Sequence, residues 1–168
     1  MATAPPSETR VARAAALKER IYLSFTSLAV LLTMAAHSEQ SAMYTATTLF
    51  ITAVGTLLTI FVADVLSHLV AHERFMTRAE LRHATVTSLN AIGAIVLPLL
   101  FLGLAALDVW ATGTAITAGI VALLFTLVVI CWIAIRRIPL TWWQRAIALT
   151  AEAVLSLIVV GLKLLSHT

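Results

Sequence analysis

The sequence predicts an all-α integral membrane protein, folded as one bundle of about five transmembrane helices. Of its 168 residues, 61% are hydrophobic and only 11% are charged, whereas an ordinary soluble domain has about 25% charged residues. Apolar runs of about 17 to 25 residues, the length that crosses a bilayer, alternate with short polar breaks along almost the whole chain. A soluble domain of this size could not bury so much apolar surface. Residues 21–168 are therefore expected to form a single transmembrane domain.

The first 20 residues are predicted to form a cytosolic segment that contains a short amphipathic helix. Ser7 is suited to cap a helix that continues to Arg20 and carries several basic side chains. We expect this helix to lie on the membrane surface and to run into the first span, about residues 21–36. A signal peptide cleaved near Ala35 is the competing interpretation, because a basic stretch and an apolar stretch precede it in that order.

The other four spans follow from the apolar runs and the breaks between them. The second, about residues 42–73, is longer than a bilayer requires and is expected to tilt or to protrude. The third, about 85–107, contains Pro98, which lacks a backbone N–H and should kink the helix. The fourth, about 111–135, is uncharged except for its flanks, and the fifth covers about 141–165.

The basic residues predict how the bundle is oriented. Of the 11 Lys and Arg residues, all but Lys163 fall before the first span or around the connections that follow the second and fourth spans. The other two connections, residues 37–41 and 108–110, contain neither Lys nor Arg. Because cytoplasmic loops accumulate basic residues, the N-terminus is predicted to be cytosolic and the C-terminus outside, in a multi-pass protein of the plasma or inner membrane. The bases bracket the spans and form no patch, so nucleic acid is not an expected partner.

Three ionisable residues form a stripe inside the second span. Asp64, His68 and His72 follow one another at intervals of four residues, close to one helical turn. Asp64 is expected to lie about 13 Å from the cytosolic end of the span, near mid-membrane. An ionisable group at that depth costs at least about 2.5 kcal/mol to insert, so its presence favours a specific role.

Two further polar residues are predicted at similar depths on other helices. Glu152 in the fifth span lies about as deep as Asp64, and Asn90 in the third lies near the level of His68. Depth alone links them, and it predicts a polar pocket that opens to the cytosol through His72 and His83.

Two chemistries suit this pocket. Asp64, His68 and Glu152 could ligate a divalent metal ion, because carboxylate and imidazole both bind borderline metals. Alternatively, Asp64, His68, His72, Asn90 and Glu152 could form an ion pathway or a proton relay, since histidine titrates near neutral pH. The structural interpretation is that Asp64 pairs with Arg145 or forms a hydrogen bond with His68 and so fixes the packing of helices.

A second stripe in the second span carries hydroxyl groups at helical spacing beside Gly55. It consists of Thr45, Thr48, Thr52, Thr56 and Thr59 and ends at Ala63. Small and hydroxyl residues at this spacing are typical of a face along which helices pack closely. The alternative is a hydroxyl-lined path for ions.

The spacing of Asp64 and His68 is similar to the paired Asp and His of cation diffusion facilitators. Those proteins carry a second such pair on another helix, whereas the fifth span here offers only Glu152. Five spans with an inward N-terminus also resemble vacuolar iron transporters, but the acidic metal-collecting insertion expected after the second span is absent.

The function favoured by these observations is membrane transport of a small cation, either a proton or a divalent metal ion, by a transporter or small channel. The alternative is a non-catalytic scaffold or subunit whose buried polar residues fix helix packing and oligomerisation. An enzyme is not expected, because the chain has no GxSxG, HExxH or CxxC motif and no glycine-rich phosphate loop. A homo-oligomer in the lipid bilayer is expected, since five helices form a small bundle.

Overall fold

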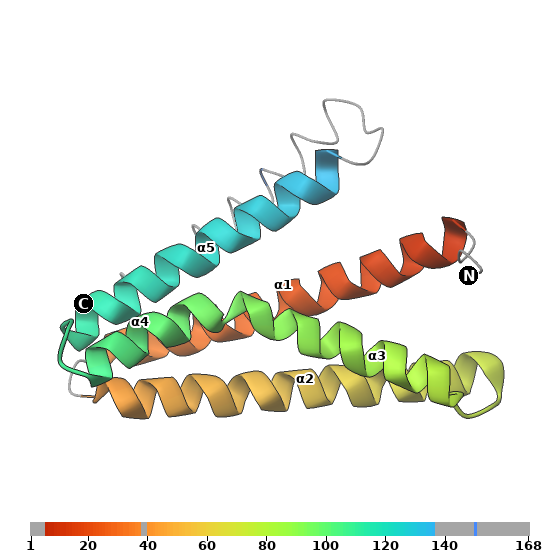
Figure 1. The fold of residues 1–168 in the computed structure, drawn as a ribbon, viewed down its shortest axis with the longest axis horizontal. Coiled ribbons are helices and arrows are strands. Elements are labelled where there is room, and N and C mark those ends of the chain that lie inside the picture. The colour runs from red at the N-terminus through yellow and green to blue at the C-terminus, as the bar shows by residue number, and fades with distance from the viewer. Residues whose placement is uncertain (1–5, 38–39, 137–149, 151–168) are drawn as a thin grey trace.

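The computed structural model describes residues 6–37, 40–136 and 150, and the side chains within residues 14–37, 40–133 and 150. Over these residues the chain is helical and contains no strand (Figure 1). The helices are α1 (Pro6–Ala36), α2 (Ala42–His72), α3 (Arg78–Ala91), the short 3₁₀ helix η1 (Ile92–Ala94), α4 (Val96–Ala106) and α5 (Thr112–Arg136).

Three helices are long and apolar enough to cross a membrane by length and composition: α1, α2 and α5. The bent pair formed by α3 and α4 provides a fourth if it is counted as one span. These helices correspond to the first four predicted spans. The predicted fifth span, residues 141–165, lies outside the described residues.

The N-terminal helix continues directly into the predicted first span. α1 runs without interruption from Pro6 to Ala36. Residues 14–23 contain neither glycine nor proline, and a continuous helix keeps the backbone donors and acceptors paired. The predicted surface helix and the first span are therefore a single element.

The ends of α2 agree with the predicted second span. The Ser41 side chain accepts a hydrogen bond from the backbone N–H of Tyr44, 3.2 Å away, and caps the first turn. At the other end Glu73 adopts a left-handed conformation with φ of 51°, and its N–H donates to the Leu69 carbonyl. Such a residue commonly closes a helix, because it satisfies a carbonyl of the last turn.

The predicted kink at Pro98 is confirmed. A proline cannot donate to the carbonyl four residues earlier, here that of Ala94, and its ring crowds that carbonyl. The helix is accordingly interrupted at η1, and α3 and α4 meet at a bend of 49°. Pro98 itself is buried, so the bend belongs to the packed interior.

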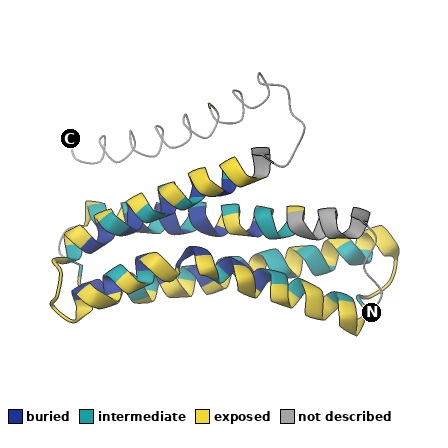
Figure 2. Cartoon of the chain, turned by 45° about the horizontal axis from the view of Figure 1, so that its top comes forward, coloured by how far each residue is buried: buried dark blue, intermediate teal, exposed yellow. Residues whose placement is uncertain are grey.

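Two groups of buried apolar side chains hold the bundle together. The larger lies toward the α1–α2 turn and joins α1, α2, α4 and α5; its members include Leu28, Leu31, Leu49, Leu102 and Leu123. The second, called here the junction cluster, joins α1, α2, α3 and the start of α4 and consists of Leu23, Ala53, Leu57, Ala91 and Ile95. Figure 2 shows the buried positions on the sides of the helices that face one another.

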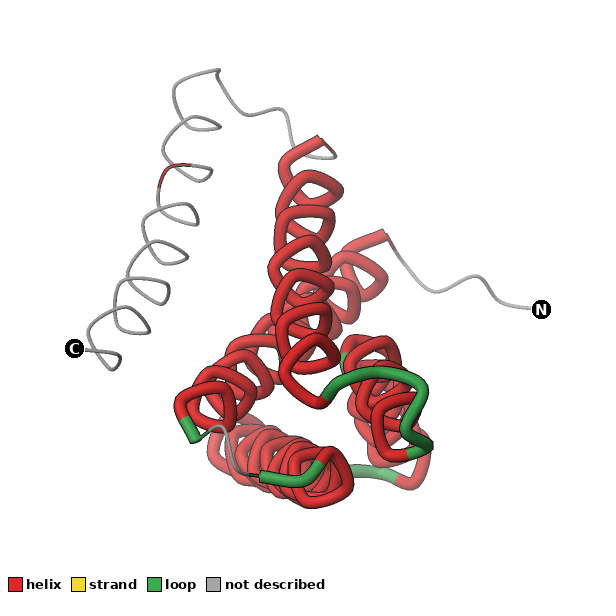
Figure 3. Tube along the Cα trace, turned by 90° about the vertical axis from the view of Figure 1, so that its left-hand side faces the viewer, coloured by secondary structure: helices red, strands yellow, loops and turns green. Residues whose placement is uncertain are grey.

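The contacts place α1 at the centre of the described bundle. It packs against α2, α3 and α5, while α5 also packs on α4. α5 then diverges from α1 toward its C-terminal end (Figures 1 and 3). One close approach fixes its first half: a Cβ atom at Gly119 would lie 3.0 Å from Leu31 Cδ1 and 3.5 Å from Pro98 Cβ.

Candidate functional site

A polar layer lies next to the junction cluster, where α1, α2 and α3 meet. Lys18 of α1 and Asp64 of α2 form an ion pair in it, with 3.0 Å between Nζ and Oδ1. The Lys18 side chain is 47% exposed and that of Asp64 is 26% exposed. Asp64 therefore has a basic partner on α1, a helix that the sequence does not predict to lie beside it.

Glu19 is the most buried charged residue described, with 1% of its surface exposed. The Ser88 hydroxyl of α3 lies beside the Glu19 carboxyl group, and Asp64 and Lys18 are within electrostatic range. Even so, neither Glu19 Oε2 nor Ser88 Oγ has a hydrogen-bond partner among the described residues. A charged carboxylate in that position would be costly unless a proton or a cation neutralised it.

The sequence contains a signal for Glu19 that our sequence analysis missed. Glu19, Leu23 and Ser27 follow one another at intervals of four, so they begin the buried stripe of α1. All three are buried in the structure. The sequence analysis predicts that the helix up to Arg20 lies on the membrane surface, and it assigns no role to Glu19.

His68 and His72 extend the polar layer toward the α2–α3 turn. Their rings stack with centroids 4.3 Å apart. His68 Nε2 lies 3.8 Å from Glu80 Oε2, which is too long for a hydrogen bond, and it has no other partner among the described residues.

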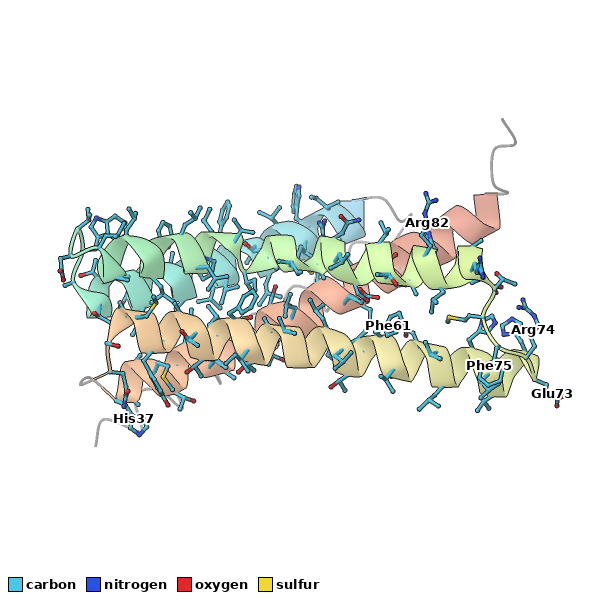
Figure 4. All side chains as sticks on the ribbon, turned by 60° about the horizontal axis from the view of Figure 1, so that its bottom comes forward. His37, Phe61, Glu73, Arg74, Phe75 and Arg82 are labelled. Carbon is cyan, nitrogen blue, oxygen red and sulfur yellow. The ribbon has the colours of Figure 1, made fainter. Side chains whose placement is uncertain are left out.

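Glu80 itself is firmly held at the start of α3, before the predicted third span. Arg74 contacts both of its carboxylate oxygens, at 2.8 and 3.0 Å, and Glu80 forms a capping box with Thr77. The Arg74 guanidinium, and after it the backbone and hydroxyl groups of Thr77, hold the pKa of Glu80 well below its usual range. Figure 4 shows Arg74 at the α2–α3 turn, at the opposite end of the bundle from His37.

The structure brings together only part of the predicted pocket. Asp64, His68 and His72 share one side of α2 and meet α1 and the start of α3 there. Asn90 is exposed on α3, and no described contact joins it to the other predicted residues. Glu152 lies outside the described residues. Within residues 6–37, 40–136 and 150, no group of three His, Cys, Asp or Glu could hold a metal ion.

A groove of about 700 Å³ runs between α1 and α2 on the other side of Lys18. Its lining includes part of the threonine stripe, and its members are Lys18, Tyr22, Thr26, Thr52, Gly55, Thr56, Thr59, Ile60 and Ala63. The hydroxyls of Thr56 and Thr59 donate to the carbonyls of Thr52 and Gly55. Their oxygen lone pairs remain free, so these groups offer the groove acceptors only.

Thr45, at the far end of the stripe, is fully buried. One end of the stripe therefore packs in the interior as predicted, and its middle lines the groove.

Comparison of the chain with protein-family models, with curated proteins and with solved structures finds no match. The similarities to cation diffusion facilitators and to vacuolar iron transporters gain no support from it. The polar layer and the groove are therefore the features of the protein that bear on its function.

Proposed function

We propose that this protein moves a small cation across a membrane, and that the cation is a proton. The observation that carries the proposal is the Glu19 carboxyl group, which is buried at a junction of three helices with one oxygen unpartnered. A buried acid that lacks a fixed partner can bind and release a proton with a large change in its interactions. Ionisable groups at membrane depth commonly mark such pathways.

The surroundings of Asp64 favour a proton over a divalent metal ion. A metal ion bound to Asp64 and His68 would have to displace Lys18, whose ammonium group is 3.0 Å from the carboxylate. Protons require no such displacement, and a series of titratable groups already leads inward. It comprises His72, His68, Asp64 and Glu19. Glu152 stays in the proposal as a further acid at matched depth.

The titratable groups form the first half of the proposed path, and the groove between α1 and α2 forms the second half. Lys18 lies in both the polar layer and the groove lining, so it joins the two. The threonine oxygens of the groove can accept hydrogen bonds from water or hydronium.

The proposal includes an orientation and an assembly. The distribution of Lys and Arg supports a cytosolic N-terminus and α2–α3 turn and an external C-terminus, and in this orientation His72 would lie at the cytosolic entrance. The groove is open at its surface, and a homo-oligomer would cover it. The protein is proposed to be a multi-pass component of the cell membrane with no catalytic activity of its own.

Proton flux into liposomes that contain the purified protein tests this function. A pH gradient should dissipate faster than in empty liposomes, and Glu19→Gln should remove the difference, because glutamine keeps the size of the side chain and cannot exchange a proton. Asp64→Asn should reduce the flux. Glu73→Gln and Asp108→Asn make the same chemical changes at exposed positions and should leave it unchanged.

Flux of Zn²⁺ or Mn²⁺ without proton flux would replace the proton by a metal ion as the substrate. Flux that survives in Glu19→Gln would remove Glu19 from the path.

The scaffold remains the second candidate, and one observation favours it. The Lys18–Asp64 pair fastens α1 to α2 inside the bundle, as a purely structural ion pair would. In that case Asp64→Asn should lower the melting temperature or change the oligomeric state, and no ion tested should cross the membrane of the liposomes.

A further inference from the structure

We propose that the outer face of α3 binds an anionic phospholipid, with Arg78 and Arg82 at the headgroup phosphate. Both arginines are exposed, and they lie four residues apart, hence within about 40° of each other around the helix. Neither forms an ion pair or a side-chain hydrogen bond with any described residue, although Glu80 lies between them in the sequence.

Arg78 and Arg82 do not pair with Glu80 because Glu80 lies on the opposite side of α3. Two residues beyond Arg78 correspond to about 200° around a helix. That direction faces α2 and the turn, where Arg74 takes both carboxylate oxygens. The pairing of Glu80 with Arg74 leaves the Arg78 and Arg82 side with two positive charges and no acid. Figure 4 shows Arg82 projecting from α3 away from α2.

The same face becomes apolar one to two turns further along α3. Val86 is 48% exposed and Leu89 is 57% exposed, and at about 100° per residue both return to the side of Arg82. Paired bases followed by exposed aliphatic side chains match a phosphate head with hydrocarbon chains. Guanidinium groups also suit phosphate, because they offer several donors in a planar fork.

This occupant fits better than a soluble anion or a nucleic acid. A free phosphate would use the two arginines but would leave Val86 and Leu89 without a role. A nucleic acid would need basic or polar groups along the whole face, whereas the chain is apolar from Val86 onward on this side. Clusters of basic residues beside a membrane span are a usual site for anionic lipids.

The test compares the melting temperature of the full-length protein in nanodiscs of phosphatidylcholine with that in nanodiscs that also contain phosphatidylglycerol. The wild type should melt at a higher temperature with the anionic lipid, and Arg78→Gln/Arg82→Gln should lose that increase. The matched control is Arg10→Gln/Arg20→Gln, which removes two arginines of α1, on the same predicted side of the membrane, and should keep it. Native mass spectrometry should show fewer retained phosphatidylglycerol molecules on the first double variant only.

Three results would overturn the proposal. An equal increase in wild type and Arg78→Gln/Arg82→Gln would mean that the arginines do not bind the lipid. If both double variants lost the increase in melting temperature equally, the increase would depend on the overall charge of the protein and not on a site at Arg78 and Arg82. Stabilisation by inorganic phosphate in phosphatidylcholine nanodiscs would indicate a site for a free anion.

Discussion

Among individual residues, Glu80 has the most contacts in the polar layer. It accepts hydrogen bonds from Arg74, from the Thr77 backbone and from the Thr77 hydroxyl, and it faces His68. One side chain thereby ends the α2–α3 turn, starts α3 and neutralises the nearest arginine. Because the turn, the start of α3 and Arg74 all depend on the Glu80 carboxylate, its ionisation should affect the stability of the protein.

We expect the stability of the protein to decrease in acid through Glu80. Because the folded state lowers the pKa of Glu80, its contribution is complete above the ordinary carboxyl pKa of about 4.3 and is lost as the pH falls below that value. Melting temperatures measured between neutral and acid pH should therefore fall less in Glu80→Gln than in the wild type. Glu73→Gln, an exposed acid outside this network, should follow the wild type. Parallel curves for wild type and Glu80→Gln would contradict the assignment.

The residue scale also shows what the sequence could and could not predict about the site. The stripe of Asp64, His68 and His72 follows from helical periodicity alone, and the structure keeps it together. Lys18 and Glu19 come from another helix, and nothing local in the sequence indicates that they lie close to Asp64. Predicting them would have required knowing that α1 continues past residue 20 and lies at the centre of the bundle.

At the scale of elements, the bend between α3 and α4 connects the polar layer to the apolar interior. Ser88 and Ala91 precede it, and Pro98 follows it and packs against the position of Gly119. The bend thus lets one span contact Glu19 on one side and α5 on the other.

Replacing Pro98 by alanine should partly straighten this span. Alanine restores a backbone donor toward the Ala94 carbonyl, while the loss of two ring carbons leaves a small gap beside Gly119. Spin labels can be placed at His83 and Leu107 in a background with Cys131 replaced by alanine. The distance between them should increase by up to about 3 Å. This is the geometric limit when the bend is removed from two helical arms of about 18 Å each. Leu100→Ala, an exposed change in the same helix, is the control. An unchanged distance would mean that packing, not Pro98, maintains the bend.

The elements were more predictable than the contacts between them. The ends of α2 follow from a capping serine and from the polar turn, and the bend follows from a single proline. These are local rules of backbone hydrogen bonding. The continuity of α1 also follows from a local rule, because no residue between its amphipathic and apolar stretches breaks a helix. The burial of Glu19 was not predicted, because the amphipathic stretch was expected to lie on the membrane surface.

At the scale of the whole molecule, the orientation of the bundle is a prediction that stands on charge alone. Single cysteines introduced into a Cys131→Ala background can test it with a membrane-impermeant maleimide. Positions Gln40 and Val109 should react from outside intact cells, because their connections carry no bases. Thr77 should react only after the membrane is opened, since Arg74 and Arg78 hold its turn inside. Labelling of Gln40 and Val109 from opposite sides would mean that the bent pair does not cross the membrane as one span.

The length of α2 has a mechanical consequence. Its 31 residues extend about 46 Å, while the hydrocarbon layer is about 30 Å thick. A change in bilayer thickness must therefore alter how far this helix leans or protrudes. Since Lys18 ties α1 to Asp64, the two helices would lean together, and stretching or thinning the surrounding lipid would be transmitted as shear to the buried carboxyl group next to that pair.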